Sequence, residues 1–246
     1  MIKPIISLFL FISHSLHAES SVPEDILDVK TIIPGLNLDM RYFGDNNFIG
    51  RKIPGYNSEK CFLQKEATQA LKEVEKELNR DRLALIIYDC YRPQRSVDYF
   101  MNWIQDSSDY RMKDYYYPEV VKKNLVKDGY IAKKSGHSKA NTIDLGLISL
   151  GSDMSKIKKL KMTDCRLPLN EQEKKVGLID MGSKYDCFDT KSHTKHRYIS
   201  KNAKKNREKL LEIMKKYGFK NYKKEWWHYS FQPNKYPDTF FDFPIE

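Results

Sequence analysis

The stretch Ser135-Gly-His137-Ser-Lys-Ala-Asn-Thr-Ile-Asp144-Leu-Gly places a histidine and an aspartate seven positions apart. Its second half, within residues 142–148, alternates apolar and other residues, which is typical of a strand with one buried face. The apolar side chains would point into the core, and Asp144 would point to the other side. An imidazole and a carboxylate that converge are two of the ligands of a zinc site, so this stretch predicts a metal centre.

The third ligand of such a site is expected near the C-terminus, in Glu225-Trp-Trp-His228-Tyr. Zinc hydrolases keep three protein ligands and leave one position for water. His137, Asp144 and His228 would be those ligands, and Glu225 would carry a proton from the water to the leaving amine. Positions three apart on a regular strand face opposite sides. Glu225 and His228 can therefore serve one metal only if the strand begins, bends or bulges between them.

Each of these side chains also has an ordinary structural interpretation. His137 and Asp144 could be a turn histidine and a solvated aspartate, and His228 could pack beneath the two tryptophans before it. Arg92 follows a long apolar run, where a guanidinium can stabilise an oxyanion. It could instead form a structural ion pair with Asp89. The bare sequence leaves these alternatives open.

The secondary structure is predicted from the pattern of apolar residues. Helices are expected at residues 66–78, 93–104, 119–127 and 200–217. Strands are expected from residue 39, at 83–88, at 142–148 and at 224–231. Strands mix with helices without a regular alternation, which favours an α+β fold.

The N-terminus predicts export. The chain has 246 residues, which suits one domain with a full core. Residues 1–18 have the layout of a secretory signal peptide, with one lysine, an apolar run and a final small residue, Ala18. The run is too short to span a bilayer, although an uncleaved N-terminal anchor is an alternative. We expect a signal peptide over 1–18, one domain over 19–246, and a periplasmic or secreted protein.

The chain is basic, with a formal net charge of +10 that falls to +9 when Lys3 leaves with the signal peptide. Anionic envelope polymers or nucleic acid are the partners that such a charge attracts. The lysine-rich runs follow helical patterns or mix with acids, which favours solvated faces. We find no nucleic-acid-binding motif and expect no nucleic-acid partner. His193 and His196 could also bind a metal, but the cations around them oppose it.

Four cysteines are present, and none lies in a Cys-x-x-Cys pair that would indicate a thiolate zinc site. An oxidising compartment allows two disulfides among Cys61, Cys90, Cys165 and Cys187, in three pairings. Pairing of Cys165 with Cys187 is favoured because these two bracket a polar, lysine-rich segment. Cys90 could simply be a buried thiol in its strand.

Taken together, the motifs resemble those of the D-alanyl-D-alanine dipeptidases, the VanX-type zinc peptidases of peptidase family M15. The resemblance runs from about residue 39 to the C-terminus. It rests on Asp45-Asn-x-Phe48-x-Gly50, Pro54-Gly-Tyr56, Tyr91-Arg92-Pro93, Tyr115-Tyr-Tyr-Pro118, Ser135-x-His137-x6-Asp144, Met181-Gly-Ser-x-Tyr-Asp186, Lys191-Ser-His193, Glu225-Trp-Trp-His228 and Tyr236-Pro237 to Phe241-Asp-Phe-Pro244.

The resemblance implies a zinc D,D-dipeptidase domain over residues 19–246, with a mostly antiparallel sheet and flanking helices, as in Hedgehog proteins and D,D-peptidases. It implies one Zn²⁺ per chain on His137, Asp144 and His228. Glu225 would be the catalytic base, and Arg92 would stabilise the transition state.

The resemblance also implies how a dipeptide is held. Asp186 and Tyr42 would receive its ammonium group, and Ser135 and Tyr56 would face its carboxylate. A free dipeptide carries a charge at each end, and a closed pocket must satisfy both.

The chain departs from the family pattern in two places. Ala140 and Thr142 stand where the family usually has glycine and alanine, which bears on the turn rather than on the ligands. Residues 149–180 are interpreted as an insertion or flap that could change which substrates enter.

The expected function is zinc-dependent hydrolysis of D-alanyl-D-alanine to two D-alanine molecules in cell-wall peptide turnover, with possible peptidoglycan association. One alternative is a related peptidoglycan D,D-carboxypeptidase or L,D-endopeptidase with the same metal ligands and a more open cleft. The other is a non-catalytic cell-wall-binding module of the same fold.

Overall fold

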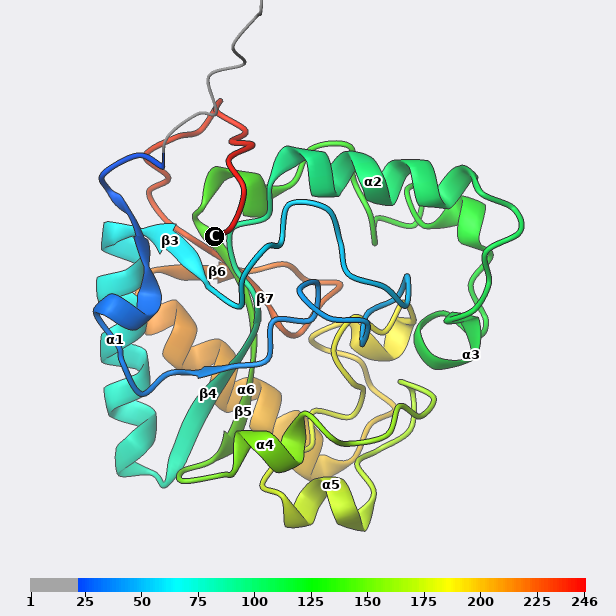
Figure 1. Ribbon diagram of the computed structural model, residues 1–246. Coiled ribbons are helices and arrows are strands. Elements are labelled where there is room, and N and C mark those ends of the chain that lie inside the picture. The colour runs from blue at the N-terminus through cyan, green and yellow to red at the C-terminus, as the bar shows by residue number, and fades with distance from the viewer. Residues whose placement is uncertain (1–21) are drawn as a thin grey trace, which may run out of the picture.

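Five strands form the central sheet of the computed structural model, which describes residues 22–246 (Figure 1). Their order is β2-β4-β5-β7-β6, and only the β2–β4 pair is parallel. Strands β1 and β3 form a separate antiparallel pair. The strands are β1 Ile26–Asp28, β2 Asn37–Leu38, β3 Phe62–Gln64, β4 Leu83–Asp89, β5 Thr142–Ser149, β6 Phe219–Asn221 and β7 His228–Phe231. The predicted single α+β domain with a mostly antiparallel sheet is confirmed.

Helices flank this sheet, and Figure 1 shows α1 and α6 beside the strands and α2 at the top of the view. The α-helices are α1 Lys65–Arg80, α2 Gln94–Gln105, α3 Lys113–Tyr116, α4 Met154–Ile157, α5 Glu171–Lys175 and α6 Lys201–Lys216. The 3-10 helices are η1 Val29–Thr31, η2 Lys122–Asn124, η3 Gly136–Lys139 and η4 Thr190–Ser192. The predicted helices at 66–78, 93–104 and 200–217 are confirmed as α1, α2 and α6, because their apolar stripes face the core.

Two hydrophobic clusters make up the interior. The first joins β4 and β5 to the buried faces of α1 and α6, including Leu71 and Leu210. The second is rich in aromatic side chains and surrounds α2, with Phe48 against both Phe100 and Trp103. Between residues 22 and 246, no helix is long and apolar enough to cross a lipid bilayer. The predicted signal peptide over 1–18 lies outside the described residues.

Three predicted elements differ from the structure. The strand expected from residue 39 is instead β2 at residues 37–38, and the following loop is built on Asn47, whose amide donates to the carbonyls of Arg41, Gly44 and Arg51. The helix expected at 119–127 is reduced to η2, since it contains adjacent β-branched valines and an asparagine. The strand expected at 224–231 begins only at residue 228.

Two disulfides, Cys61–Cys90 and Cys165–Cys187, cross-link the described chain. The favoured Cys165–Cys187 pairing is confirmed, and the interpretation of Cys90 as a free thiol is wrong. Cys61 lies just before β3 and Cys90 just after β4, so the bond joins the small sheet to the large one. This partner was hidden from the sequence because it depends on how distant strands are arranged.

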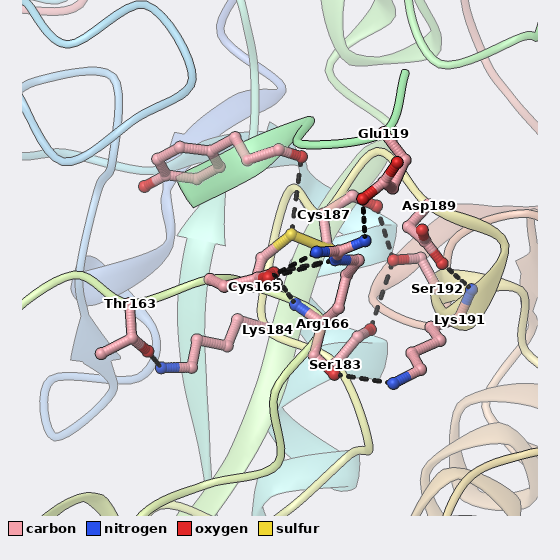
Figure 2. The surroundings of a disulfide bond; sticks show 12 residues. Glu119, Thr163, Cys165, Arg166, Ser183, Lys184, Cys187, Asp189, Lys191 and Ser192 are labelled. Atoms are coloured by element: carbon pink, nitrogen blue, oxygen red, sulfur yellow. Dashed lines mark hydrogen bonds and ion pairs between the residues drawn. A yellow bond between two sulfur atoms is a disulfide. The ribbon is translucent and has the colours of Figure 1, made fainter. Parts of the chain in front are cut away.

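Residues 149–180 pack against the domain rather than forming a loose flap. Leu178 bridges to Ile148, and the amide of Ile179 donates to the carbonyl of Leu147. Figure 2 shows Arg166 beside the Cys165–Cys187 disulfide, where its guanidinium pairs with Glu119. The segment is therefore anchored at several points.

Candidate metal centre and substrate cavity

Strand pairing brings the predicted metal ligands together. On β4 and β5, Asp89 is the direct cross-strand partner of Asp144. On β5 and β7, Asp144 is the direct partner of His228. His137 lies in η3, the turn that leads into β5. Three neighbouring strands and one turn thus deliver the polar side chains to one level of the sheet.

The three predicted ligands point at a common centre. Asp144 Oδ1 lies 3.1 Å from His228 Nδ1 and 3.3 Å from His137 Nε2, and the two nitrogens are 3.3 Å apart. Asp144 Oδ1 is buried and has no hydrogen-bond partner among the described residues. A buried carboxylate oxygen without a donor is costly unless a cation satisfies it. Two imidazoles and a carboxylate are the donor set of a catalytic zinc site, so these residues fit that metal.

The orientation of His137 also suits a metal. Its Nδ1 lies 2.6 Å from the carbonyl oxygen of Cys90, so Nδ1 carries the hydrogen and Nε2 keeps its lone pair. The turn that holds His137 closes at Ala140, whose φ of 54° is left-handed. Glycine adopts this conformation without strain, which explains the glycine expected at this position in the family.

Burial and the charge of neighbouring residues have opposite effects on the pKa of Asp144, and burial also shifts the pKa of His228. Burial alone would raise the pKa of Asp144, but His137 and His228 hold it well below its ordinary value. Burial lowers the pKa of His228. The ionised carboxylate and the neutral imidazole are the forms that bind a metal ion.

Glu225 lies beside the ligands because β7 begins where it does. Residues 222–227 contain two turns and no strand, and the strand starts at His228. Glu225 Oε2 therefore lies 3.4 Å from His228 Nδ1, which a regular strand would have prevented. Burial, together with the nearby charges of Asp144 and Asp186, raises the pKa of Glu225 well above its usual range. A carboxyl group with a raised pKa is suited to accept and return a proton.

Arg92 takes part in both of the arrangements considered for it. Its guanidinium binds Asp89 at 2.8 Å and lies 3.7 Å from Asp144 Oδ2. It also stacks over the rings of Tyr42 and Phe100, at 4.9 and 5.2 Å from their centroids. Asp89 thus fixes the guanidinium, which still borders the cavity beside the metal ligands.

The expected substrate-binding residues occupy different positions. Tyr42 lines the cavity and donates a 2.7 Å hydrogen bond to Asp186, which lies behind it. Burial and the charge of Asp144 raise the pKa of Asp186 to about 7. Ser135 also lines the cavity. Tyr56 does not, because its hydroxyl donates to Asp89 at 2.6 Å.

The cavity itself has a volume of about 280 Å³. Its polar lining combines the metal ligands with Arg92 and Glu225, and its apolar wall includes Phe48 and Phe188. No residue of the segment 149–180 lines it within the described chain. The segment therefore does not form the wall of this cavity, as an insertion that selects substrates would.

Two further residues organise the site, of which sequence reasoning named Asp89 only as a structural partner of Arg92 and missed Tyr185. Asp89 contacts Arg92 and Tyr56, and one of its oxygens lies 3.5 Å from His137 Nδ1. Tyr185 donates to Asp144 Oδ2 at 3.1 Å. A carboxylate that ends a buried apolar strand is a signal that could have identified Asp89. Nothing in the local sequence indicates the partner of Tyr185.

Comparison with known proteins agrees with this geometry. A family model for peptidase M15, described as D-ala-D-ala dipeptidase, matches residues 23–158 and 164–246. A D-alanyl-D-alanine dipeptidase of Enterococcus faecium is 32% identical over 215 residues, covering 87% of this chain and 95% of that protein. One of Streptomyces coelicolor is 32% identical, covering 90% and 98%. One of Escherichia coli is 28% identical, covering 87% and 88%.

Proposed function

Because the chain belongs to the M15 peptidase family of D-alanyl-D-alanine dipeptidases, we propose that it hydrolyses D-alanyl-D-alanine to two D-alanine molecules with the aid of zinc. The observation that carries this proposal is the convergence of His137, Asp144 and His228 on one centre, with Glu225 beside it. A binding module would have no use for a buried carboxylate at that place.

A zinc ion on His137, Asp144 and His228 would supply a Lewis acid and activate water at neutral pH. Glu225 takes the proton from the attacking water and passes it to the departing amine of the second D-alanine. Arg92, held by Asp89, stabilises the negative charge that develops on the carbonyl oxygen of the peptide bond.

The two ends of the dipeptide need different partners. Asp186, with Tyr42 in front of it, receives the ammonium group, and ionised Asp186 is the form that attracts it. Ser135 faces the carboxylate at the other end of the cavity. Tyr56 acts on the carboxylate only after its hydroxyl leaves Asp89, so its direct role depends on a rearrangement.

We further propose that the protein is exported to the periplasm or secreted and acts in peptidoglycan turnover, in association with the wall. Three features support this: the signal-peptide layout of residues 1–18, the two disulfides, and the excess of basic residues. Disulfides persist in oxidising compartments, and a basic protein is attracted to anionic envelope polymers.

The first test is the release of D-alanine from D-alanyl-D-alanine by purified protein, with and without a chelator. The variant Glu225→Ala, which removes the base, is assayed beside it. We expect metal-dependent release that falls by about 10²- to 10⁴-fold in the variant. The exposed Glu66→Ala is the matched control and should retain full activity. Absence of release from zinc-loaded wild-type protein would contradict the proposal.

A further inference from the structure

A second hollow, of about 860 Å³, lies between the segment 193–198, helix α6 and strand β6. We refer to it as the basic groove. Its walls are formed by the residues His193, Thr194, Lys195, His196, Arg197, Tyr198, Leu211, Lys215, Phe219, Lys220, Asn221 and Lys223. The groove has no part in the catalytic site described above, and its residues contain no acid.

The cations of the basic groove are not neutralised. Lys195, Arg197, Lys215, Lys220 and Lys223 form no ion pair with any carboxylate in residues 22–246. Elsewhere on α6, Lys209 pairs with Asp81 and Lys216 with Glu77, whereas Lys201, Lys204 and Lys205 form no ion pair with a described carboxylate. A solvated helix face usually mixes both signs of charge. The five unpaired cations of the groove line a concave surface without an acid, which concentrates a positive potential.

The two histidines of the groove have pKa values below the ordinary value, chiefly because of burial. Burial lowers the pKa of His193, and the nearby charge of Lys224 lowers it further. Burial also lowers the pKa of His196, and Arg207 adds to the effect. Among the described residues, the group that could hold a metal ion is His137, Asp144 and His228 and does not include these two histidines.

The floor of the groove is apolar and its rim carries an aromatic ring. Phe219 and Leu211 line the floor, and Tyr198 is 84% exposed. An exposed tyrosine ring next to cations offers a flat apolar face and a positive edge to one ligand. Sugar rings that carry carboxylates have both of the complementary features.

Two other hollows adjoin the basic groove. Residues 194–197 also line a neighbouring hollow, together with Lys204, Arg207 and Glu208. On the opposite side, Lys223 lines the groove while the preceding residue, Tyr222, lines the catalytic cavity. One turn therefore borders both sites. A long ligand in the groove would lie next to the cavity mouth.

We propose that the basic groove binds peptidoglycan, through the carboxylates of its peptide stems and the sugar rings of its glycan. This inference rests on the proposed function, because it assigns the wall association to a particular surface. Nucleic acid is a poorer match, since single-stranded binding uses a row of aromatic side chains and the groove exposes one. Attachment at the groove would hold the enzyme where wall peptides are released.

The test uses the triple variant Lys195→Gln, Arg197→Gln and Lys220→Gln. The matched control is Lys72→Gln, Lys123→Gln and Lys127→Gln, three exposed lysines outside the groove, with the same loss of charge. Binding to isolated peptidoglycan sacculi is measured by co-sedimentation at two salt concentrations. We expect the groove variant to bind at least about tenfold more weakly and the control to bind like wild type. Sacculi with amidated carboxylates should bind wild type as weakly as native sacculi bind the groove variant.

Three results would overturn the inference. They are equal loss of binding in both triple variants, undiminished binding to amidated sacculi, and displacement of the protein from sacculi by low concentrations of single-stranded DNA. Hydrolysis of free D-alanyl-D-alanine is assayed in the same preparations and should be the same in both variants. If wild-type protein binds sacculi through the groove but releases no D-alanine, the proposed dipeptidase function fails and the binding surface stands.

Discussion

The Nδ1 atom of His137 lies 2.6 Å from the backbone carbonyl oxygen of Cys90, whose sulfur is bonded to Cys61. A disulfide cysteine thus orients a predicted metal ligand through its main chain. Partners that orient a ligand in this way typically raise metal affinity by about 10- to 100-fold.

Removal of the Cys61–Cys90 bond should therefore weaken zinc binding as well as stability. In the variant Cys61→Ser with Cys90→Ser, we expect the free energy of unfolding to fall by about 2 to 4 kcal/mol. The zinc affinity should fall about tenfold, as measured by competition with a chelating dye. The control is Cys165→Ser with Cys187→Ser, which should lose similar stability and keep the zinc affinity. Equal zinc affinities in all three proteins would count against the role of Cys90.

Metal removal should lower the melting temperature, because the ion binds only the folded site. At about 100 times its Kd, zinc should add about 2.7 kcal/mol, or roughly 5 to 10 °C in Tm. His228→Ala should abolish this zinc-dependent part, whereas His193→Ala should retain it. Differential scanning fluorimetry with and without chelator measures both. A zinc effect that survives in His228→Ala would place the metal elsewhere.

The loop that carries Asp186 is held by a buried guanidinium. Arg207 on α6 donates to the carbonyls of Met181, Lys191 and His193 and is 2% exposed. Arg207→Met would leave the carbonyls of Met181 and Lys191 without this donor, whereas the carbonyl of His193 keeps the amide of His196.

We expect Arg207→Met to lower the free energy of unfolding by about 2 to 4 kcal/mol. It should also raise KM for the dipeptide more than it lowers kcat, because the misplaced loop holds the substrate's ammonium group. Exposed Arg197→Met should change stability by less than about 0.5 kcal/mol. A kcat defect with unchanged KM would show that the loop does not position Asp186 for binding.

The charge of Asp186 should matter for a free dipeptide and not for a longer peptide. Asp186→Asn keeps the size of the side chain and removes the partner of the ammonium group. We expect KM for D-alanyl-D-alanine to rise by about 10- to 100-fold, since a hydrogen bond to a charged group contributes about 1.5 to 3 kcal/mol. Steady-state kinetics on the dipeptide and on a stem pentapeptide measure this. If the wild type cleaves the pentapeptide rapidly and Asp186→Asn cleaves it at the same rate, the carboxypeptidase alternative is favoured.

Glu75 should make stability depend on pH in mildly acidic solution. It is 8% exposed and accepts a 2.8 Å hydrogen bond from the amide of Leu85, and burial raises its pKa above the ordinary 4.5. As pH rises above about 4.5, the unfolded chain releases this proton before the folded chain does. The free energy of unfolding therefore falls until the pKa of the folded state is passed.

Urea denaturation from pH 4 to pH 7 tests this prediction with Glu75→Gln. The variant lacks the titrating group, so its stability relative to wild type should increase across that range. Glu66→Gln on the exposed face of the same helix should show no such trend. A constant difference between Glu75→Gln and wild type would mean that Glu75 does not contribute to the pH dependence.

Much of the fold follows from local sequence because its main elements have strong periodic patterns. Helices α1 and α6 and strands β4 and β5 each bury an apolar face whose spacing is visible in the sequence. The two-residue strand β2 carries no such pattern, and neither does β6. Their existence depends on the neighbouring strands with which they pair.

The candidate site could be predicted only for residues whose type and spacing indicate their chemical role. The sequence predicts His137, Asp144 and His228 as a ligand set, and the condition that a strand begin between Glu225 and His228 is met in the structure. The bond from Tyr185 to Asp144 was not predictable, because it joins loops and strands far apart in the chain. The hydrogen bond from the hydroxyl of Tyr56 to Asp89 was not predictable for the same reason.

Cys90 joins two chemical events in the maturation of this protein, since thiol oxidation occurs at its side chain and histidine orientation at its main chain. The order of these events then determines which molecules in a preparation can load metal. Reduced chains would differ from oxidised chains of the same length only in the hydrogens of their thiols, and would hold zinc less tightly. Activity should thus be expressed per mole of bound zinc, because activity per mole of protein would report the history of the sample.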